Sequence, residues 1–313
     1  MIREATAADY PAAFRVVRAA YPDFVQTEEG FRHGQESLPA EARAKGWVAE
    51  VNGEIVGLAR SMIRYQQSSG SANANVSVSP AWRRRGVGSA LYDQALEHVA
   101  DAPRVFAFTG EDGRAFAELH GFVLTQTSRI SALDPRAIDT AELNRIPVEL
   151  RTLAEVGPEA TFAVDSVAVL DIPFDEPLDN VTYEQWRQRY WESPDFDFAS
   201  SYAACVDGRP VAISYAAVDR PGSRAVNAFT GTLPEYRGRG LARTVKLAVI
   251  RRLAELGVSL LVTDNHEENA PMLAVNERLG FRPHGAHYSY LLERSGNGLR
   301  ASAGGLGGET GTP

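Results

Sequence analysis

The chain has 313 residues, which is long for one compact domain and comfortable for two domains of about 150 residues each. Its 44% hydrophobic and 23% charged residues exclude a disordered or collagen-like chain. The single Cys205 excludes an internal disulfide, the net charge of −8 argues against nucleic-acid binding, and no apolar stretch approaches the roughly 18 residues of a membrane span. We expect a cytoplasmic protein without a nucleic-acid or membrane partner.

In chain order, the first half is predicted to run strand, helical segment, hairpin, strand, helix, strand, helix and strand. The hairpin turns at Asn52-Gly53, because these residue types tolerate the positive φ that a two-residue turn requires. After a basic glycine loop, an amphipathic helix is predicted over residues 89–99 and an apolar strand over 104–108. Gly121-Phe122 then ends the next helix.

The second half repeats this order about 155 residues later. Asp207-Gly208 turns a second hairpin, the corresponding helix and strand are predicted over 243–256 and 259–263, and Gly280-Phe281 ends the last helix. Landmarks in the same order at near-constant separation predict a duplicated domain. The alternation of strands and helices predicts an α/β fold, with a mixed, mostly antiparallel central sheet flanked by helices in each of two tandem domains.

The predicted boundaries follow from this repeat. The two domains are expected over residues 1–137 and 147–295, joined by a linker over 138–146. Residues 296–313 are rich in Gly, Ser and Ala without apolar periodicity, so we expect a disordered tail.

Both halves place the spacing Arg-x-x-Gly-x-Gly/Ala between a strand and a helix. Glycine lets the backbone turn sharply near a ligand, and the free N–H groups and dipole of the helix start attract anions. Neither a triphosphatase phosphate loop nor the third glycine of a dinucleotide fingerprint is present. A helix start with solvent-facing arginines is the alternative, but its repetition favours an anion site at Arg83, Gly86 and Gly88 and at Arg237, Gly240 and Ala242.

With this loop, both halves resemble the GNAT N-acetyltransferase superfamily, over residues 1–135 and 147–294, and the chain is similar to its tandem members. The resemblance implies acetyl-coenzyme A (acetyl-CoA) as the cofactor, with its pyrophosphate held by the loop. The residues it implies for binding in the second half are Thr232, Leu233, Arg237, Gly238, Arg239, Gly240, Leu241, Ala242, Asn265 and Asn269. Those in the first half are Val78, Arg83, Arg84, Arg85, Gly86, Val87, Gly88 and Ser89.

The resemblance is more complete in the second half, where Asn269 stands at a position occupied by Gly110 in the first. We therefore expect the second half to be the main active site. Many members of the superfamily place a tyrosine four residues before the Gly-Phe, to protonate the leaving thiolate. The equivalent residues here are Asn276 and Ala117, and neither can serve as that acid.

The implied reaction is direct attack of a small-molecule amine on the thioester, which requires deprotonation of the ammonium. By the same resemblance, backbone N–H groups near Val78 and Leu233 would stabilise the oxyanion. The catalytic candidates are Glu235, Asn276 and Tyr288, while other bases after the fifth strand of the second half remain open: Asp264, His266, Glu267 and Glu268.

The histidines lack metal-ligand spacing, so no metal is expected. The expected partner is a small-molecule amine acceptor, and the expected state is a monomer, as an internal pseudo-dimer, or a weak homodimer. Because the usual tyrosine is missing, an acetyl-CoA binding or regulatory protein without turnover is the alternative function.

Overall fold

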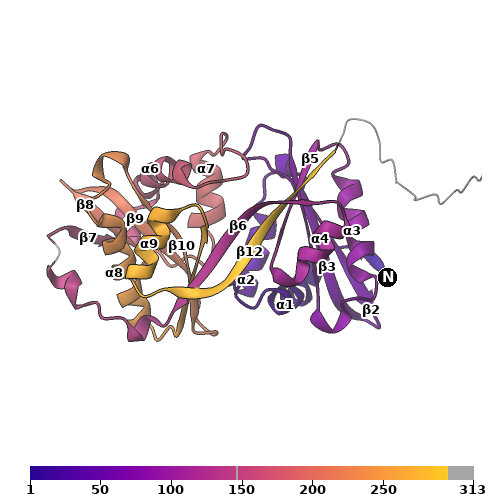
Figure 1. Cartoon of the computed structure of the whole chain (residues 1–313), viewed down its shortest axis with the longest axis horizontal. Coiled ribbons are helices and arrows are strands. Elements are labelled where there is room, and N and C mark those ends of the chain that lie inside the picture. Colours follow the sequence, from indigo (N-terminus) through magenta and orange to yellow (C-terminus); the bar gives the residue numbers. More distant parts are fainter. Residues whose placement is uncertain (146, 295–313) are drawn as a thin grey trace, which may run out of the picture.

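A computed structural model describes residues 1–145 and 147–294, so the predicted tail over 296–313 lies outside the described residues. The described strands form one continuous sheet (Figure 1). Their order across the sheet is β1 (Ile2–Glu4), β2 (Lys45–Val51), β3 (Glu54–Ile63), β4 (Ala72–Val78), β5 (Arg104–Thr109), β12 (Arg282–Glu293), β6 (Val123–Leu133), β11 (Leu260–His266), β10 (Arg224–Thr232), β9 (Arg209–Asp219), β8 (Tyr202–Val206) and β7 (Glu149–Thr152).

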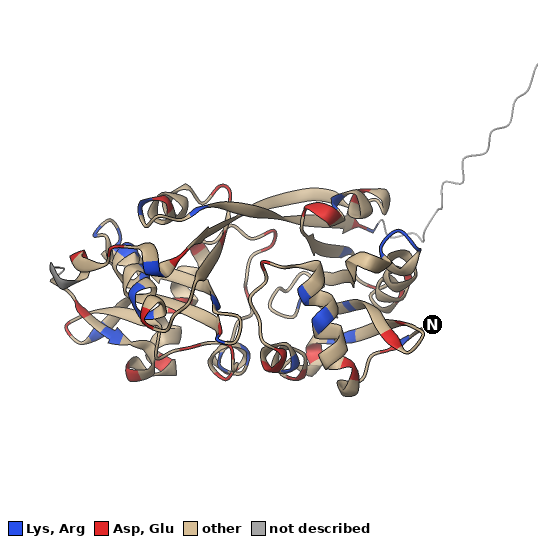
Figure 2. Ribbon diagram, turned by 90° about the horizontal axis from the view of Figure 1, so that it is seen from below, with Lys and Arg blue, Asp and Glu red and all other residues tan. Residues whose placement is uncertain are grey.

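The two halves exchange their last strands. β12, the final strand of the second half, inserts between β5 and β6 of the first half, with Tyr288 opposite Thr109. β6 in turn lies beside β11, with Ala132 opposite Val262. Figures 1 and 2 show these two long strands crossing from one half of the molecule to the other. Residues near the carboxyl end therefore belong to the core of the first half, where Tyr290 is fully buried.

Helices cover both faces of the sheet in the first half. The segments α1 (Tyr10–Ala20) and α2 (Glu28–Glu36) bury Phe14 and Phe31 against β2 and β3. On the opposite face, α3 (Val87–His98) and α4 (Arg114–Leu119) pack in a larger core around Leu91 and Ala117. This arrangement places the start of α3 beside the end of β4.

The second half has the same two layers. The helix α6 (Pro158–Ala168) packs on β9 and β10, with the short segments α5 (Leu153–Val156) and α7 (Tyr183–Trp186) beside it. The helices α8 (Leu241–Glu255) and α9 (Ala270–Arg278) cover the other face. Within the part of the chain that the structure describes, no helix combines the length and apolar character needed to cross a bilayer.

The predicted fold class is confirmed. β4 pairs with β5 and β10 with β11 in parallel, whereas the other strand pairs are antiparallel, so the sheet is mixed. Both predicted hairpin turns take positive φ, at 52° and 81° for Asn52-Gly53 and at 50° and 75° for Asp207-Gly208. The helices after the glycine loops begin two residues earlier than predicted, because Gly86 and Gly240 are themselves the N-caps.

Candidate active site

The two glycine loops have nearly the same geometry. Gly86 and Gly240 take left-handed φ values of 81° and 78° at the N-caps of α3 and α8, and no side chain closes either helix start. A Cβ added to either glycine would meet nothing within 4 Å, so the space above each loop is open to a ligand. Free N–H groups and the positive end of a helix dipole face this space in both halves.

The arginines of the loops also correspond. Arg85 lies 5.0 Å from the ring centroid of Trp82 in η3 (Pro80–Trp82), and Arg239 lies 5.1 Å from that of Tyr236 in η9 (Pro234–Tyr236). The first arginine of each loop, Arg83 or Arg237, donates through Nε to a carbonyl near the end of the preceding strand, at 3.3 Å and 3.2 Å. Arginine held in this way supplies positive charge at a fixed position.

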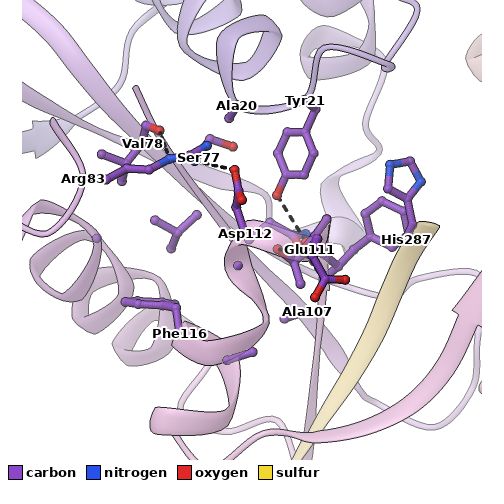
Figure 3. Close-up of a pocket in the computed structure, with 18 of the residues that line it drawn as sticks. Ala20, Tyr21, Ser77, Val78, Arg83, Ala107, Glu111, Asp112, Phe116 and His287 are labelled. Carbon is purple, nitrogen blue, oxygen red and sulfur yellow. Dashed lines mark hydrogen bonds and ion pairs between the residues drawn. The ribbon is translucent and has the colours of Figure 1, made fainter. Parts of the chain in front are cut away.

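In the first half, a cavity of about 540 Å³ runs inward from the loop. Arg83 lies at one end, and Tyr21 and His287 lie at the other (Figure 3). Gly86 and Ser89 of the loop also line the cavity. The cavity lies where β4 and β5 part: the two strands pair at two positions near the start of β4 and then diverge. A chain-like ligand with an anionic end fits this shape, because the anion meets the loop and the rest passes between the strands.

The second half fills the corresponding region with buried polar side chains. Lys246, which aligns with Tyr92 of the cavity wall, is 2% exposed; its ammonium donates to Asn227 and lies 5.2 Å from the ring centroid of Phe281. Burial lowers the pKa of Lys246 to about 7. The hydroxyl of Thr263 on β11 reaches the carbonyl of Asn227 on β10 at 3.4 Å. These contacts link α8, β10 and β11 behind the second loop.

The structure separates the predicted catalytic residues. Glu235 is exposed in η9, whereas Asn276 is buried and donates to Asn265 Oδ1 at 2.6 Å. Tyr288 lies in the first half, where its hydroxyl donates to Glu111 Oε2 at 2.6 Å. The strand exchange is the cause, since β12 carries Tyr288 away from the half in which it was counted.

Several second-half residues that were predicted to bind the cofactor form hydrogen bonds within the chain. The backbone N–H of Leu233 donates to the carbonyl of Val211 at 2.9 Å, so this group is not a free oxyanion donor. The side chain of Asn269 caps α9 by accepting from the N–H of Met272 at 3.3 Å. By contrast, the Thr232 hydroxyl and the Asn276 Oδ1 are buried without a hydrogen-bond partner among the described residues.

The remaining predicted residues lie at the loops themselves. Leu241 and Ala242 form the first turn of α8, and Gly238 has a left-handed φ of 74°. In the first half, Arg84 takes the matching φ of 60°. The first turn of α3 is formed by Val87, Gly88 and Ser89, and a Cβ added to Gly88 would lie 3.4 Å from the ring of Phe116, within ordinary contact.

Sequence reasoning gave no role to Tyr21 or His287, which both line the first-half cavity. The Tyr21 hydroxyl donates to the carbonyl of Phe108 at 3.4 Å, and burial raises its pKa. His287 enters through β12, so only knowledge of the strand exchange would have placed it here.

Comparisons with known proteins agree with this architecture. Residues 9–122 and 167–281 each match the family described as "Acetyltransferase (GNAT) family". A mycothiol acetyltransferase of Saccharomonospora viridis is 30% identical over 243 residues, covering 73% of this chain and 76% of that protein. A mycothiol acetyltransferase of Geodermatophilus obscurus is 29% identical, with coverage of 94% and 92%.

Solved structures share the fold. A tandem GNAT protein from the clavulanic acid biosynthesis pathway has a TM-score of 0.70 at 21% identity, covering 94% of this chain and 98% of that one. A GCN5-related N-acetyltransferase from Sphaerobacter thermophilus has a TM-score of 0.67 at 20% identity, with coverage of 96% and 97%.

The chain belongs to the GNAT acetyltransferase family. Within it, the protein is an acyl-CoA-dependent acetyltransferase with two GNAT repeats, organised like mycothiol synthase. Members of this family generally use acetyl-CoA. The first-half residues fit that molecule, because the open loop over Gly86 suits its pyrophosphate and the cavity can accept the rest.

Proposed function

We propose that the protein transfers an acetyl group from acetyl-CoA to the amine of a small molecule by direct attack, and that the first half carries out this reaction. The observation that supports this assignment is the cavity that joins the loop at Gly86 to the space around Tyr21 and His287. The proposal departs from the expectation that the second half is the main site.

The contrast between the halves supports this choice. Both loops can attract an anion, but acetyl transfer also requires the thioester to reach an acceptor through the gap between two strands. In the first half that gap is part of the cavity. In the second half, Lys246, which aligns with Tyr92 of the cavity wall, is buried and donates to Asn227 on β10. We propose that the second half chiefly supports the first, to which it contributes β12.

A small-molecule acceptor is supported by the relatives, which are named mycothiol acetyltransferases. The segment after α1, which contains Tyr21 and Asp23, lines the cavity together with the β12 residues Gly285 and His287. Segments from both halves therefore surround the space in which the acceptor amine would lie.

The test is thiol release from acetyl-CoA in the presence of a panel of small primary amines, with acetylated product identified by mass spectrometry. We expect turnover with at least one amine and formation of an amide. Binding of acetyl-CoA without product from any amine would favour the second candidate, a binding or regulatory protein. The observation behind that candidate is that neither Ala117 nor Asn276 supplies the acid that the superfamily usually places there.

A further inference from the structure

The exchanged strand places a histidine in the cavity of the first half. The imidazole of His287 lines the cavity, and its centroid lies 4.7 Å from that of the Phe108 ring on β5 (Figure 3). The side chain is 12% exposed, so it is largely enclosed yet still reached by solvent. The loop and the strands that form most of this cavity come from the first half, whereas His287 comes from the second.

A carboxylate fixes the orientation of this imidazole. Asp264 on β11 places Oδ2 2.8 Å from Nδ1 of His287, and β6 lies between the two strands that carry them. A carboxylate accepts, so Nδ1 carries the proton and Nε2 keeps a lone pair. Among the described residues, Nε2 has no hydrogen-bond partner. The pair therefore presents a free basic nitrogen in a fixed orientation.

The carboxylates that line the same cavity are already engaged. Asp23 lies 2.9 Å from Nε2 of His284, and Asp112 accepts from Arg83 at 2.7 Å. Glu111 accepts from the Tyr288 hydroxyl at 2.6 Å and from Arg114 at 3.3 Å. All three carboxylates are therefore held in contacts with neighbouring side chains.

The phenols of the cavity are unsuited to accept a proton at neutral pH. Burial raises the pKa of Tyr92 to about 12 and also raises that of Tyr21. On the remaining neighbouring strand, β6, Ser128 lies opposite His287, and the adjacent Arg129 forms an ion pair with Glu277 at 3.6 Å. Of the titratable groups along the described cavity, the imidazole is the one that offers a neutral basic nitrogen without a partner.

We propose that His287 is the general base that deprotonates the acceptor amine in the first-half cavity, and that Asp264 is its positioning residue. This inference rests on the proposed acetyl transfer and on the first half as its site. Each half then supplies an indispensable part of one active centre: the first half provides the loop and the cavity, and the second half provides the base.

The proton balance of the step is complete. Nε2 takes one proton from the ammonium of the acceptor, and the neutral nitrogen forms a bond to the carbonyl carbon of the thioester. The carbon–sulfur bond breaks, and its electron pair leaves with sulfur. The nitrogen loses its second proton as the amide forms, the thiolate takes up a proton, and the proton on His287 passes to solvent, so that one proton is released per turnover.

The test compares His287→Gln with the matched control His284→Gln. Both histidines lie on β12 and contact an aspartate, but His284 does not line the cavity. We expect kcat/KM for the amine to fall about 100-fold in His287→Gln, the lower end of what general-base catalysis contributes. In the pH profile of kcat/KM for this variant, one ionisation on the acid side should disappear, while the ionisation of the amine remains. His284→Gln should keep the wild-type kcat/KM and the wild-type pH profile.

Asp264→Asn tests the positioning role. Asparagine still accepts from Nδ1 but removes the negative charge that would stabilise the protonated imidazole, so we expect kcat to fall about tenfold, with KM for acetyl-CoA unchanged. Thermal unfolding and calorimetry with acetyl-CoA establish that each variant is folded and binds the donor.

The outcomes separate this inference from the proposed function. Wild-type protein that acetylates an amine, together with a His287→Gln variant of equal kcat/KM and equal pH profile, would overturn the role of His287 and leave acetyl transfer intact. Wild-type protein that binds acetyl-CoA but acetylates no amine would overturn both.

Discussion

The two halves of the molecule have nearly identical glycine loops and different interiors behind them. Gly86 and Gly240 differ in φ by only a few degrees, and the arginine contacts repeat. Behind the first loop Tyr92 borders an open cavity, and behind the second Lys246 is buried against Asn227. A glycine loop of this geometry therefore shows where a donor could attach, while the side chains behind it determine whether the rest of the donor has room.

The comparison also explains why duplication need not give two active sites. The exchange of β6 and β12 makes each half depend on the other for its last strand. In our account the first half gains His287 from this exchange, whereas the second half contributes structure and a base.

The largest effect is expected at the first glycine loop. Gly86→Glu places a carboxylate where the pyrophosphate would bind, so we expect acetyl-CoA affinity to fall about 100-fold or more through charge repulsion. Gly240→Glu is a matched control, since both positions have left-handed φ and equally open surroundings. Gly240→Glu should lower the free energy of unfolding about as much as Gly86→Glu does, but it should leave turnover nearly unchanged. Calorimetry that ranks the two variants in the opposite order would reverse the assignment of the halves.

A smaller effect is expected from Arg83→Gln. This change removes a positive charge from the cavity and leaves the carboxylate of Asp112 without its cationic partner. We expect about a tenfold increase in KM for acetyl-CoA, close to the strength of one charge-assisted hydrogen bond. Arg237→Gln, which removes the ion pair of the corresponding arginine with Asp171, should change KM less than twofold. Equal effects in both halves would mean that both loops bind the donor.

The smallest effect concerns the interior of the second half. Between pH 7 and about 10.4 the unfolded chain holds a proton on Lys246 that the folded chain releases, so the free energy of unfolding should rise with pH across this range. Lys246→Met should remove this rise and stabilise the protein by about 1 kcal/mol at pH 6. Urea unfolding at several pH values measures the free energy of unfolding, with substitution of the exposed Lys45, Lys45→Met, as the control.

The activity of Lys246→Met provides a second test. If the second half only supports the first, Lys246→Met should retain the wild-type kcat. A large loss of kcat without loss of stability would give Lys246 a part in the chemistry and would contradict the division between the halves.

The features that the sequence predicted well are local ones. Asn52-Gly53 and Asp207-Gly208 form their turns because the required φ depends on those residues themselves. The left-handed φ of Gly86 and Gly240 at the N-caps of α3 and α8 likewise follows from the glycines themselves. The fold class was also predicted correctly, because the same alternation of strands and helices occurs in both halves of the sequence.

The features that escaped sequence reasoning depend on distant partners. A last strand of either half shows the same local pattern whether it pairs within its own half or with the other, so the exchange of β12 had no local signal. Tyr288 was therefore counted in the wrong surroundings, and His287 was not linked to Asp264 or to the cavity. The burial of Lys246 was equally hidden, because a lysine on an amphipathic helix usually faces solvent.

The most direct test is a crystal structure of the full chain with acetyl-CoA and a non-reactive analogue of the acceptor. Our account predicts the pyrophosphate at the N–H groups of Val87, Gly88 and Ser89, the thioester between β4 and β5, and the acceptor nitrogen within hydrogen-bond distance of His287 Nε2. A donor bound only between β10 and β11, with the acceptor beside Asn276, would contradict the account.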